Sequence, residues 1–205
     1  MQEEQAGRSK SSTFSIAVSG QIEKVAAPSF NHVYCRYTYV YGTDWTLVAG
    51  SEEGLTQVGK RAVFQAHSSH DAAFDVVWNH PLDVTFTSSN PFGWPQLVFS
   101  VMGSSSVGGD VIKGYGAIHI PPIPGCHVLS VPLFAPEASS LLGRFRAWLT
   151  GRKPELLDAK VVAQGEGRAV LTVQSEGLLF LKLNVMSREL RKHGYRLGSP
   201  TLTGT

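Results

Sequence analysis

The 205-residue chain has few charged residues, and this shortage excludes several classes of protein. Asp, Glu, Lys and Arg make up 17% of the sequence, below the usual share of about 25%, while hydrophobic residues make up 42%. A chain this apolar is not intrinsically disordered, and it lacks the charge-rich composition of a coiled coil. A formal net charge of +2 is too small to drive electrostatic binding of nucleic acid, so we expect no nucleic-acid partner.

Cysteines and long apolar runs are scarce as well. Two cysteines, Cys35 and Cys126, are too few for a disulfide framework, and we expect both to be small buried thiols in a reducing compartment. No apolar run approaches the roughly 20 residues that a membrane-spanning helix needs, and residues 1–10 contain no apolar signal segment. The sequence therefore predicts a soluble cytoplasmic protein.

Glycine and proline are frequent, with 21 and 11 residues, and they separate short stretches in which polar and apolar residues alternate. A period of two residues indicates half-buried β-strands. Turn signals about every 8–12 residues favour an antiparallel β-sandwich over a parallel α/β sheet. The predicted strands are 14–22, 33–41, 61–66, 73–78, 82–87, 96–102, 111–120, 128–133, 169–173 and 178–185.

Three details of this strand pattern are specific enough to test. Asn79 to Pro81 is expected to separate two strands, because proline is tolerated in a sheet only at an edge or at a strand start. Residues 50–60 are expected to form a loop. Gly114 and Gly116 are expected to mark a bulge or a close approach of two backbones.

One segment has the period of a helix instead of a strand. Between residues 137 and 149, apolar side chains recur at the spacing of a single helix face, and Gly151 follows as a C-cap. These side chains are Leu141, Leu142, Phe145, Trp148 and Leu149. We therefore predict one helix inserted late in an otherwise all-β fold.

The two ends of the chain are predicted to differ from its middle. Residues 188–195 are basic and are expected to form a short C-terminal helix. The polar residues 1–12 and the tail 196–205 are expected to be disordered, because chain ends without apolar anchors seldom pack. This leaves 13–195 as a single predicted domain.

The reactive side chains do not form a recognisable catalytic or metal site. His67 and His70 are three residues apart with Asp71 beside them, but their Ser-rich surroundings offer no third or fourth ligand at metal-binding spacing. The other acidic loop residues, Asp44 and Asp110, lack the clustered carboxylates that Ca²⁺ requires. We therefore predict no enzymatic activity, no metal and no cofactor.

Two groups of side chains are candidates for binding. Large aromatic residues in turns either fill the end of a sandwich or anchor a partner. Basic residues late in the chain either form a solvated face or bind anionic lipid or an acidic partner. The candidate partner or membrane contacts are Trp45, Phe92, Trp94, Arg144, Arg152, Lys153, Arg191 and Lys192.

Several stretches of the chain, spread from about Phe14 to Tyr195, resemble the B9 domain family. The most specific are Asn90-Pro-Phe-Gly-Trp-Pro95 and Val161-Val-Ala-Gln-Gly-Glu-Gly-Arg168. Tyr39-Val-Tyr-Gly-Thr-Asp-Trp45 adds a further match. The resemblance implies a C2-type β-sandwich without a full set of Ca²⁺ ligands and without catalytic residues.

The same resemblance implies a place in the cilium. B9 proteins belong to a transition-zone complex with Meckel syndrome proteins and tectonics, and three related B9 proteins associate with one another. The complex restricts the diffusion of membrane proteins between the ciliary and plasma membranes. We therefore expect a non-catalytic scaffold at the basal body and transition zone, in the cytoplasm and cytoskeleton. The alternative is a Ca²⁺-independent phospholipid-binding C2-type module that acts alone.

Overall fold

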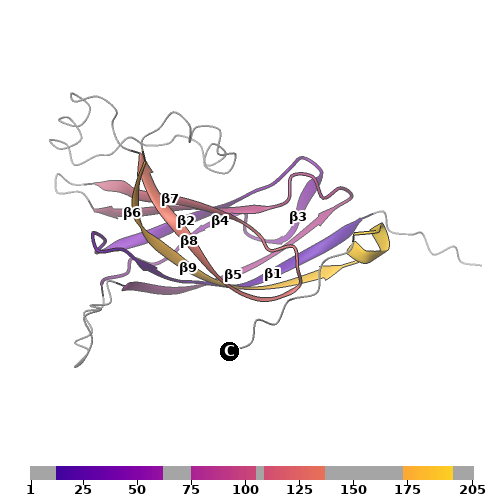
Figure 1. Cartoon of the computed structure of the whole chain (residues 1–205), viewed down its shortest axis with the longest axis horizontal. Helices are drawn as coiled ribbons and strands as arrows, with labels where there is room; N and C mark the ends of the chain where they lie inside the picture. The colour runs from indigo at the N-terminus through magenta and orange to yellow at the C-terminus, as the bar shows by residue number, and fades with distance from the viewer. Residues whose placement is uncertain (1–12, 62–74, 105–108, 137–172, 196–205) are drawn as a thin grey trace, which may run out of the picture.

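The computed structural model describes residues 13–61, 75–104, 109–136 and 173–195, which form nine β-strands and one short 3₁₀ helix. These elements are β1 (Phe14–Ala26), β2 (Val33–Val40), β3 (Trp45–Gly50), β4 (Glu53–Leu55), β5 (Asp75–Ser88), β6 (Gln96–Ser104), β7 (Asp110–His119), β8 (Gly125–Pro136), β9 (Val173–Arg188) and η1 (Leu190–His193). The predicted all-β class is confirmed for this part of the chain. Figure 1 shows the strands running along the molecule, with η1 at one end.

The strands pair antiparallel in the order β3-β5-β1-β9-β8-β7-β6-β2-β4. β8 pairs with β9 along its whole length but with β7 only where Tyr115 meets Phe134. The sheet folds back on itself at this weak seam, because strands far apart in the order touch across the core. The Trp78 Nε1 group of β5 donates to the Val33 oxygen of β2 at 3.1 Å. The result is two layers around one core (Figure 1).

The core is built from the inward face of each long strand. The predicted apolar face of β1 is fully buried, and so are the inward positions of β6 and β9. Removing these side chains from water is the main stabilising term of the fold, at about 25 cal/mol per Å² of apolar surface. The residues concerned are Phe14, Ile16, Val18, Ile22, Leu97, Phe99, Val101, Leu179, Leu181 and Leu183.

Asn79 to Pro81 does not separate two strands, so this prediction is wrong. β5 continues through the segment, with Asn79 at φ 48° and a shift in the β1–β5 register beside Ile22. The bulge absorbs the irregular residues without ending the strand. Pro81 is tolerated because β3 pairs with β5 only from Val84 onward, so Pro81 has a ladder partner, Gln21 of β1, on one side alone.

The predicted loop at residues 50–60 is also wrong in part, because β4 lies within it and β3 ends at its first residue, Gly50. Both are short edge strands of the sheet. Most of their side chains are exposed on both faces, so no apolar alternation marks them in the sequence. By contrast, the predicted bulge is confirmed beside Gly114, because the β6–β7 register shifts between Val101, which pairs with Gly114, and Met102, which pairs with Ile112. At Gly116 the close neighbour is a side chain, since a Cβ there would lie 2.8 Å from Cγ1 of Val131.

The predicted C-terminal helix is wrong. β9 continues to Arg188, Glu189 then takes φ 71°, and Gly194 at φ 84° ends a 3₁₀ turn of four residues. Leu190 is buried in this turn and ties it to the core. The predicted helix at 137–149 and the disordered ends lie outside the described residues, as do 62–66, 73–74 and 169–172 of the predicted strands. Within the described ranges, no helix is long and apolar enough to cross a membrane.

The two cysteines differ, so the prediction that both are buried is wrong for one of them. Cys35 is fully buried in the core, and burial raises the pKa of its thiol far above the ordinary value of 9.0. Cys126 is exposed because it lies on the outward side of β8, opposite Asn184.

This difference predicts that alkylation of the native protein modifies Cys126 and spares Cys35. The buried thiol reacts only when the core opens, so we expect its modification to be at least about 100-fold slower. Iodoacetamide labelling followed by mass spectrometry measures both rates. The Cys126→Ser variant is the control, and rapid labelling of that variant would contradict the buried position of Cys35.

Candidate partner-binding turn

The predicted aromatic contacts come together at one end of the sandwich. Trp45 begins β3, and Phe92 and Trp94 lie in the turn between β5 and β6. We call residues 88–95 the Phe92 turn. Its backbone lies against the turn between β2 and β3, where the Gly42 N–H donates to the Gly93 oxygen at 2.9 Å.

Local sequence explains how the Phe92 turn forms. The side-chain oxygen of Asn90 accepts from the Phe92 N–H at 3.0 Å, which closes an Asx turn. Pro91 fixes its own backbone angle, and Gly93 takes φ 70°, a conformation that residues with side chains rarely adopt. The Asn-Pro-Phe-Gly order therefore suits this one turn geometry.

Two tryptophans support the turn from behind. Trp45 is 3% exposed; its Nε1 donates to the Phe92 oxygen at 2.9 Å, and its ring lies edge-on to that of Phe14 at 5.4 Å. Trp94 is half-buried; its Nε1 donates to the Ile120 oxygen at 2.8 Å, and its ring centroid is 5.1 Å from that of Trp45. Both indoles thus have their single donor satisfied within the fold.

The Phe92 side chain itself is 82% exposed. Aromatic residues in turns either fill the end of a sandwich or anchor a partner, and the three residues here differ in which role they fit. Trp45 and Trp94 fill the end of the sandwich, and Phe92 is the ring that remains available to a partner.

Replacing Gly93 by alanine is expected to distort the Phe92 turn and lower the free energy of unfolding by about 1–3 kcal/mol. A Cβ at this position would lie 2.5 Å from the Gly42 Cα, and alanine resists a φ of 70°. Urea denaturation measures the change in stability. A variant with wild-type stability would contradict the close packing of the two turns.

The basic candidates are only partly within the described chain. Arg191 and Lys192 are exposed on η1, and the Lys192 ammonium lies 2.6 Å from the Glu189 carboxylate. The Tyr195 ring beyond η1 lies 6.1 Å from that of Phe14, which places η1 at the same end as the Phe92 turn. The remaining basic candidates, Arg144, Arg152 and Lys153, lie outside the described residues.

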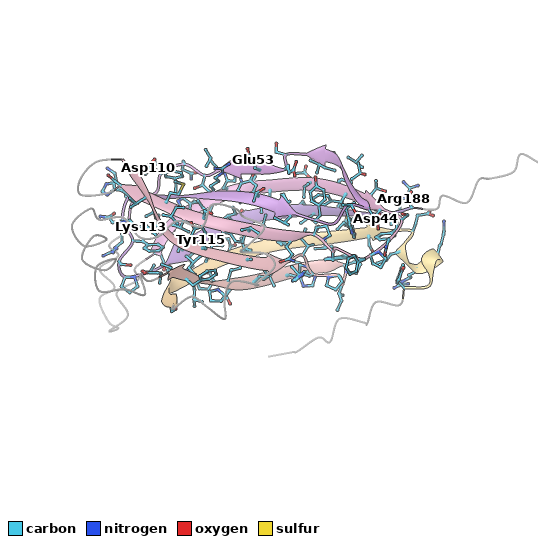
Figure 2. The ribbon with its side chains drawn as sticks, turned by 90° about the horizontal axis from the view of Figure 1, so that it is seen from above. Asp44, Glu53, Asp110, Lys113, Tyr115 and Arg188 are labelled. Atoms are coloured by element: carbon cyan, nitrogen blue, oxygen red, sulfur yellow. The ribbon has the colours of Figure 1, made fainter. Side chains whose placement is uncertain are left out.

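Figure 2 separates the two ends of the molecule. Asp44, beside the Phe92 turn, and Arg188, just before η1, are labelled at one end, and Asp110 and Lys113 are labelled at the other. Asp44 and Asp110 therefore cannot share a Ca²⁺ ion. Among the described residues, no group of three or more His, Cys, Asp or Glu side chains is placed to hold a metal. His67, His70 and Asp71, whose spacing in the sequence does not predict a metal site, lie outside the described residues.

A half-buried histidine of β5 lies close to a tyrosine of β2. The His80 Nε2 atom lies 3.4 Å from the Tyr37 hydroxyl. Burial lowers the pKa of His80 from its ordinary value of 6.5 and raises that of Tyr37. Both groups are therefore neutral near pH 7, and neither is an activated nucleophile.

The sequence identifies the aromatic residues of the turn but not the residues that position them. Asn90 and Asp44 join the two turns through the Asn90 Nδ2 group, which donates to the Asp44 carboxylate at 3.0 Å. Gly42 and Gly93 let the two backbones touch. The available signal is the Asn-Pro-x-Gly order, which is typical of a turn with proline at its second position.

The described residues define a two-layered antiparallel β domain. Its most exposed large apolar side chain, Phe92, lies on a turn held by hydrogen bonds. Residues 16–186 match the model of the B9-C2 family, described as ciliary basal body-associated B9 proteins. The chain belongs to this family of ciliary proteins, which confirms the resemblance seen in the sequence.

Individual relatives agree with this assignment. The chain is 47% identical to B9 domain-containing protein 1 of Xenopus laevis, over 92% of this chain and 91% of that protein. It is 46% identical to human B9 domain-containing protein 1, over 94% and 91% of the two chains, and 31% identical to human B9 domain-containing protein 2, over 87% and 97%. Among solved structures, it is similar to a C2 domain of plant extended synaptotagmin 1, with a TM-score of 0.43 and 12% identity over 83% of this chain and 92% of that domain.

Proposed function

We propose that the protein is a non-catalytic scaffold subunit of the ciliary transition-zone complex that contains Meckel syndrome and tectonic proteins. In this role it is required for ciliogenesis and for the diffusion barrier that retains ciliary membrane proteins. Membership of the B9-C2 family over residues 16–186 is the observation that carries the proposal. It acts at the basal body and transition zone, within the cytoplasm and cytoskeleton.

The proposed partners are other B9-domain proteins and membrane proteins of the transition zone. Two different human proteins, B9 domain-containing proteins 1 and 2, are similar to this chain over most of its length. Related chains of the same family therefore occur together in one organism, as a hetero-oligomer of B9 domains requires. The exposed Phe92 ring supports a binding role, because an aromatic side chain carried on a hydrogen-bonded backbone needs no backbone ordering on association.

A phospholipid-binding module that acts alone is the second candidate. Arg191 is exposed at the same end of the sandwich as Phe92, and an aromatic ring beside basic residues suits an anionic membrane surface. The charge available is modest, because Lys192 is paired with Glu189. We therefore prefer the scaffold.

Co-expression separates the two candidates. The full chain is produced with the other B9-domain proteins of the same organism, and the products are separated by size exclusion. We expect a stable complex, and failure of every combination to yield one would contradict the scaffold. In parallel, the isolated chain is sedimented with phosphatidylserine vesicles at low and high salt. Strong salt-sensitive binding by the chain alone would favour the lipid module.

A further inference from the structure

Phe92 combines two properties that are seldom found together on a protein surface. Its side chain is 82% exposed, the largest exposed fraction among the large hydrophobic residues of the described chain. Its backbone, by contrast, is held on both sides. The N–H donates to the Asn90 side chain at 3.0 Å, and the oxygen accepts from the Trp45 indole at 2.9 Å. The ring is therefore presented from a fixed base.

The support for this base extends into the core. The Trp45 ring packs edge-on against the fully buried Phe14, and the Trp94 indole is anchored to the Ile120 oxygen. Gly42 and Gly93 bring the two turns into backbone contact. A residue whose backbone is held in this way needs no backbone ordering when it binds, which favours an aromatic residue as an interface hot spot.

The geometry points to Phe92 as an anchor that inserts into an apolar pocket of a partner protein, with the exposed polar residues around it forming the rim of the interface. This inference rests on the proposed scaffold function and names the surface that the scaffold uses. The rim residues Thr43, Asp44, Ser89 and Asn90 are all exposed. A single ring within a polar rim is the arrangement of a protein–protein hot spot, in which the rim excludes water from the anchor.

Arg188 and Arg191 are exposed at the same end of the sandwich, but the charge bonded directly to the Phe92 turn is acidic and favours a protein over a membrane. The Asp44 carboxylate accepts from Asn90 Nδ2 at 3.0 Å and so lies beside the Phe92 turn. An anionic membrane would repel this carboxylate as the ring entered the bilayer. A protein pocket with Lys or Arg at its edge would instead attract it, so the partner chemistry that fits is an apolar pocket with a basic rim.

Affinity measurements on the co-expressed complex test the anchor. Phe92→Ala should weaken association with the B9 partner by at least about 30-fold, as expected for a hot-spot aromatic, and Phe92→Leu should lose less. Val128→Ala is the matched control, because Val128 is 74% exposed on β8 and is not part of the Phe92 turn, and its loss should change affinity less than about twofold. Urea denaturation of the Phe92 variants serves as the check on folding. If their free energy of unfolding equals that of the wild type, the loss of affinity is an effect on binding alone.

A second variant tests the chemistry of the pocket. Asp44→Asn removes the charge but keeps an oxygen that can accept from Asn90. We expect weaker binding at low salt and a reduced salt dependence, because the attraction to a basic rim is lost. If Asp44→Asn leaves binding unchanged or strengthens it, the inference that the partner's pocket has a basic rim is wrong.

The outcomes separate this inference from the function on which it rests. A wild-type complex that tolerates Phe92→Ala leaves the scaffold intact and overturns the anchor. If Phe92→Ala abolishes binding to phosphatidylserine vesicles but spares the complex, the ring is a membrane contact, and the inference is also overturned. The absence of any wild-type complex contradicts the scaffold function and the anchor together.

Discussion

Replacement of Phe86 by alanine is expected to lower the free energy of unfolding by about 3–5 kcal/mol. Phe86 is fully buried on β5, and its ring centroid lies 5.5 Å from that of Tyr39 and 5.2 Å from that of Tyr41. The side chain therefore fills space between the two layers, and its removal leaves a cavity that neighbouring strands cannot close without losing their pairing. Since natural domains are stable by about 5–15 kcal/mol, this loss takes much of the available stability.

The matched control is the same substitution at Phe92. Its ring is 82% exposed, so Phe92→Ala should change the free energy of unfolding by no more than about 0.5 kcal/mol. Urea denaturation of both variants gives the comparison. Equal shifts in the two midpoints would contradict the different burial of these two phenylalanines.

A second large effect is expected at Gly20, where alanine should destabilise the fold by about 3 kcal/mol or more. A Cβ at Gly20 would overlap the carbonyl oxygen of Lys182 and lie 2.9 Å from the Cα of Leu183. Both neighbours are backbone atoms of β9, so no side-chain rotation relieves the clash. β1 pairs with β5 on one side and β9 on the other, and the strain therefore falls on two ladders at once.

Gly114 provides the control for this prediction. It also lies within a paired strand, but a Cβ there would be no nearer than 3.4 Å to its neighbours, an ordinary van der Waals contact. Gly114→Ala should therefore change stability by less than about 1 kcal/mol. Thermal melting of the two alanine variants distinguishes a local clash from a general intolerance of substitution.

The faces of the long strands can be predicted from sequence because burial follows their two-residue period. The alternation from Phe14 to Ile22 identifies the buried face of β1, and the doubly apolar run from Gln96 to Met102 identifies a strand paired on both sides. These signals lie within single strands, so the buried face can be identified without knowing which other strands it contacts.

The remaining features depend on contacts between distant residues. β3 and β4 are edge strands with mostly exposed side chains, so they carry no period. Asn79 remains within β5 because the partner strand β1 accommodates a bulge, which the sequence around Asn79 does not reveal. Similarly, the aromatic turn is recognisable in the sequence, but only the hydrogen bonds of Trp45 and Trp94 separate the two supporting indoles from the exposed Phe92.

The pairing of β1 with β9 has a consequence for biosynthesis. Ser15 lies opposite Arg188, so the central ladder of one layer joins segments made at widely separated times on the ribosome. Until β9 emerges, one edge of β1 has no partner strand, and nascent chains in this state are prone to association. Premature stop codons before residue 178 should therefore yield chains that chaperones retain and proteases remove, rather than shortened scaffolds.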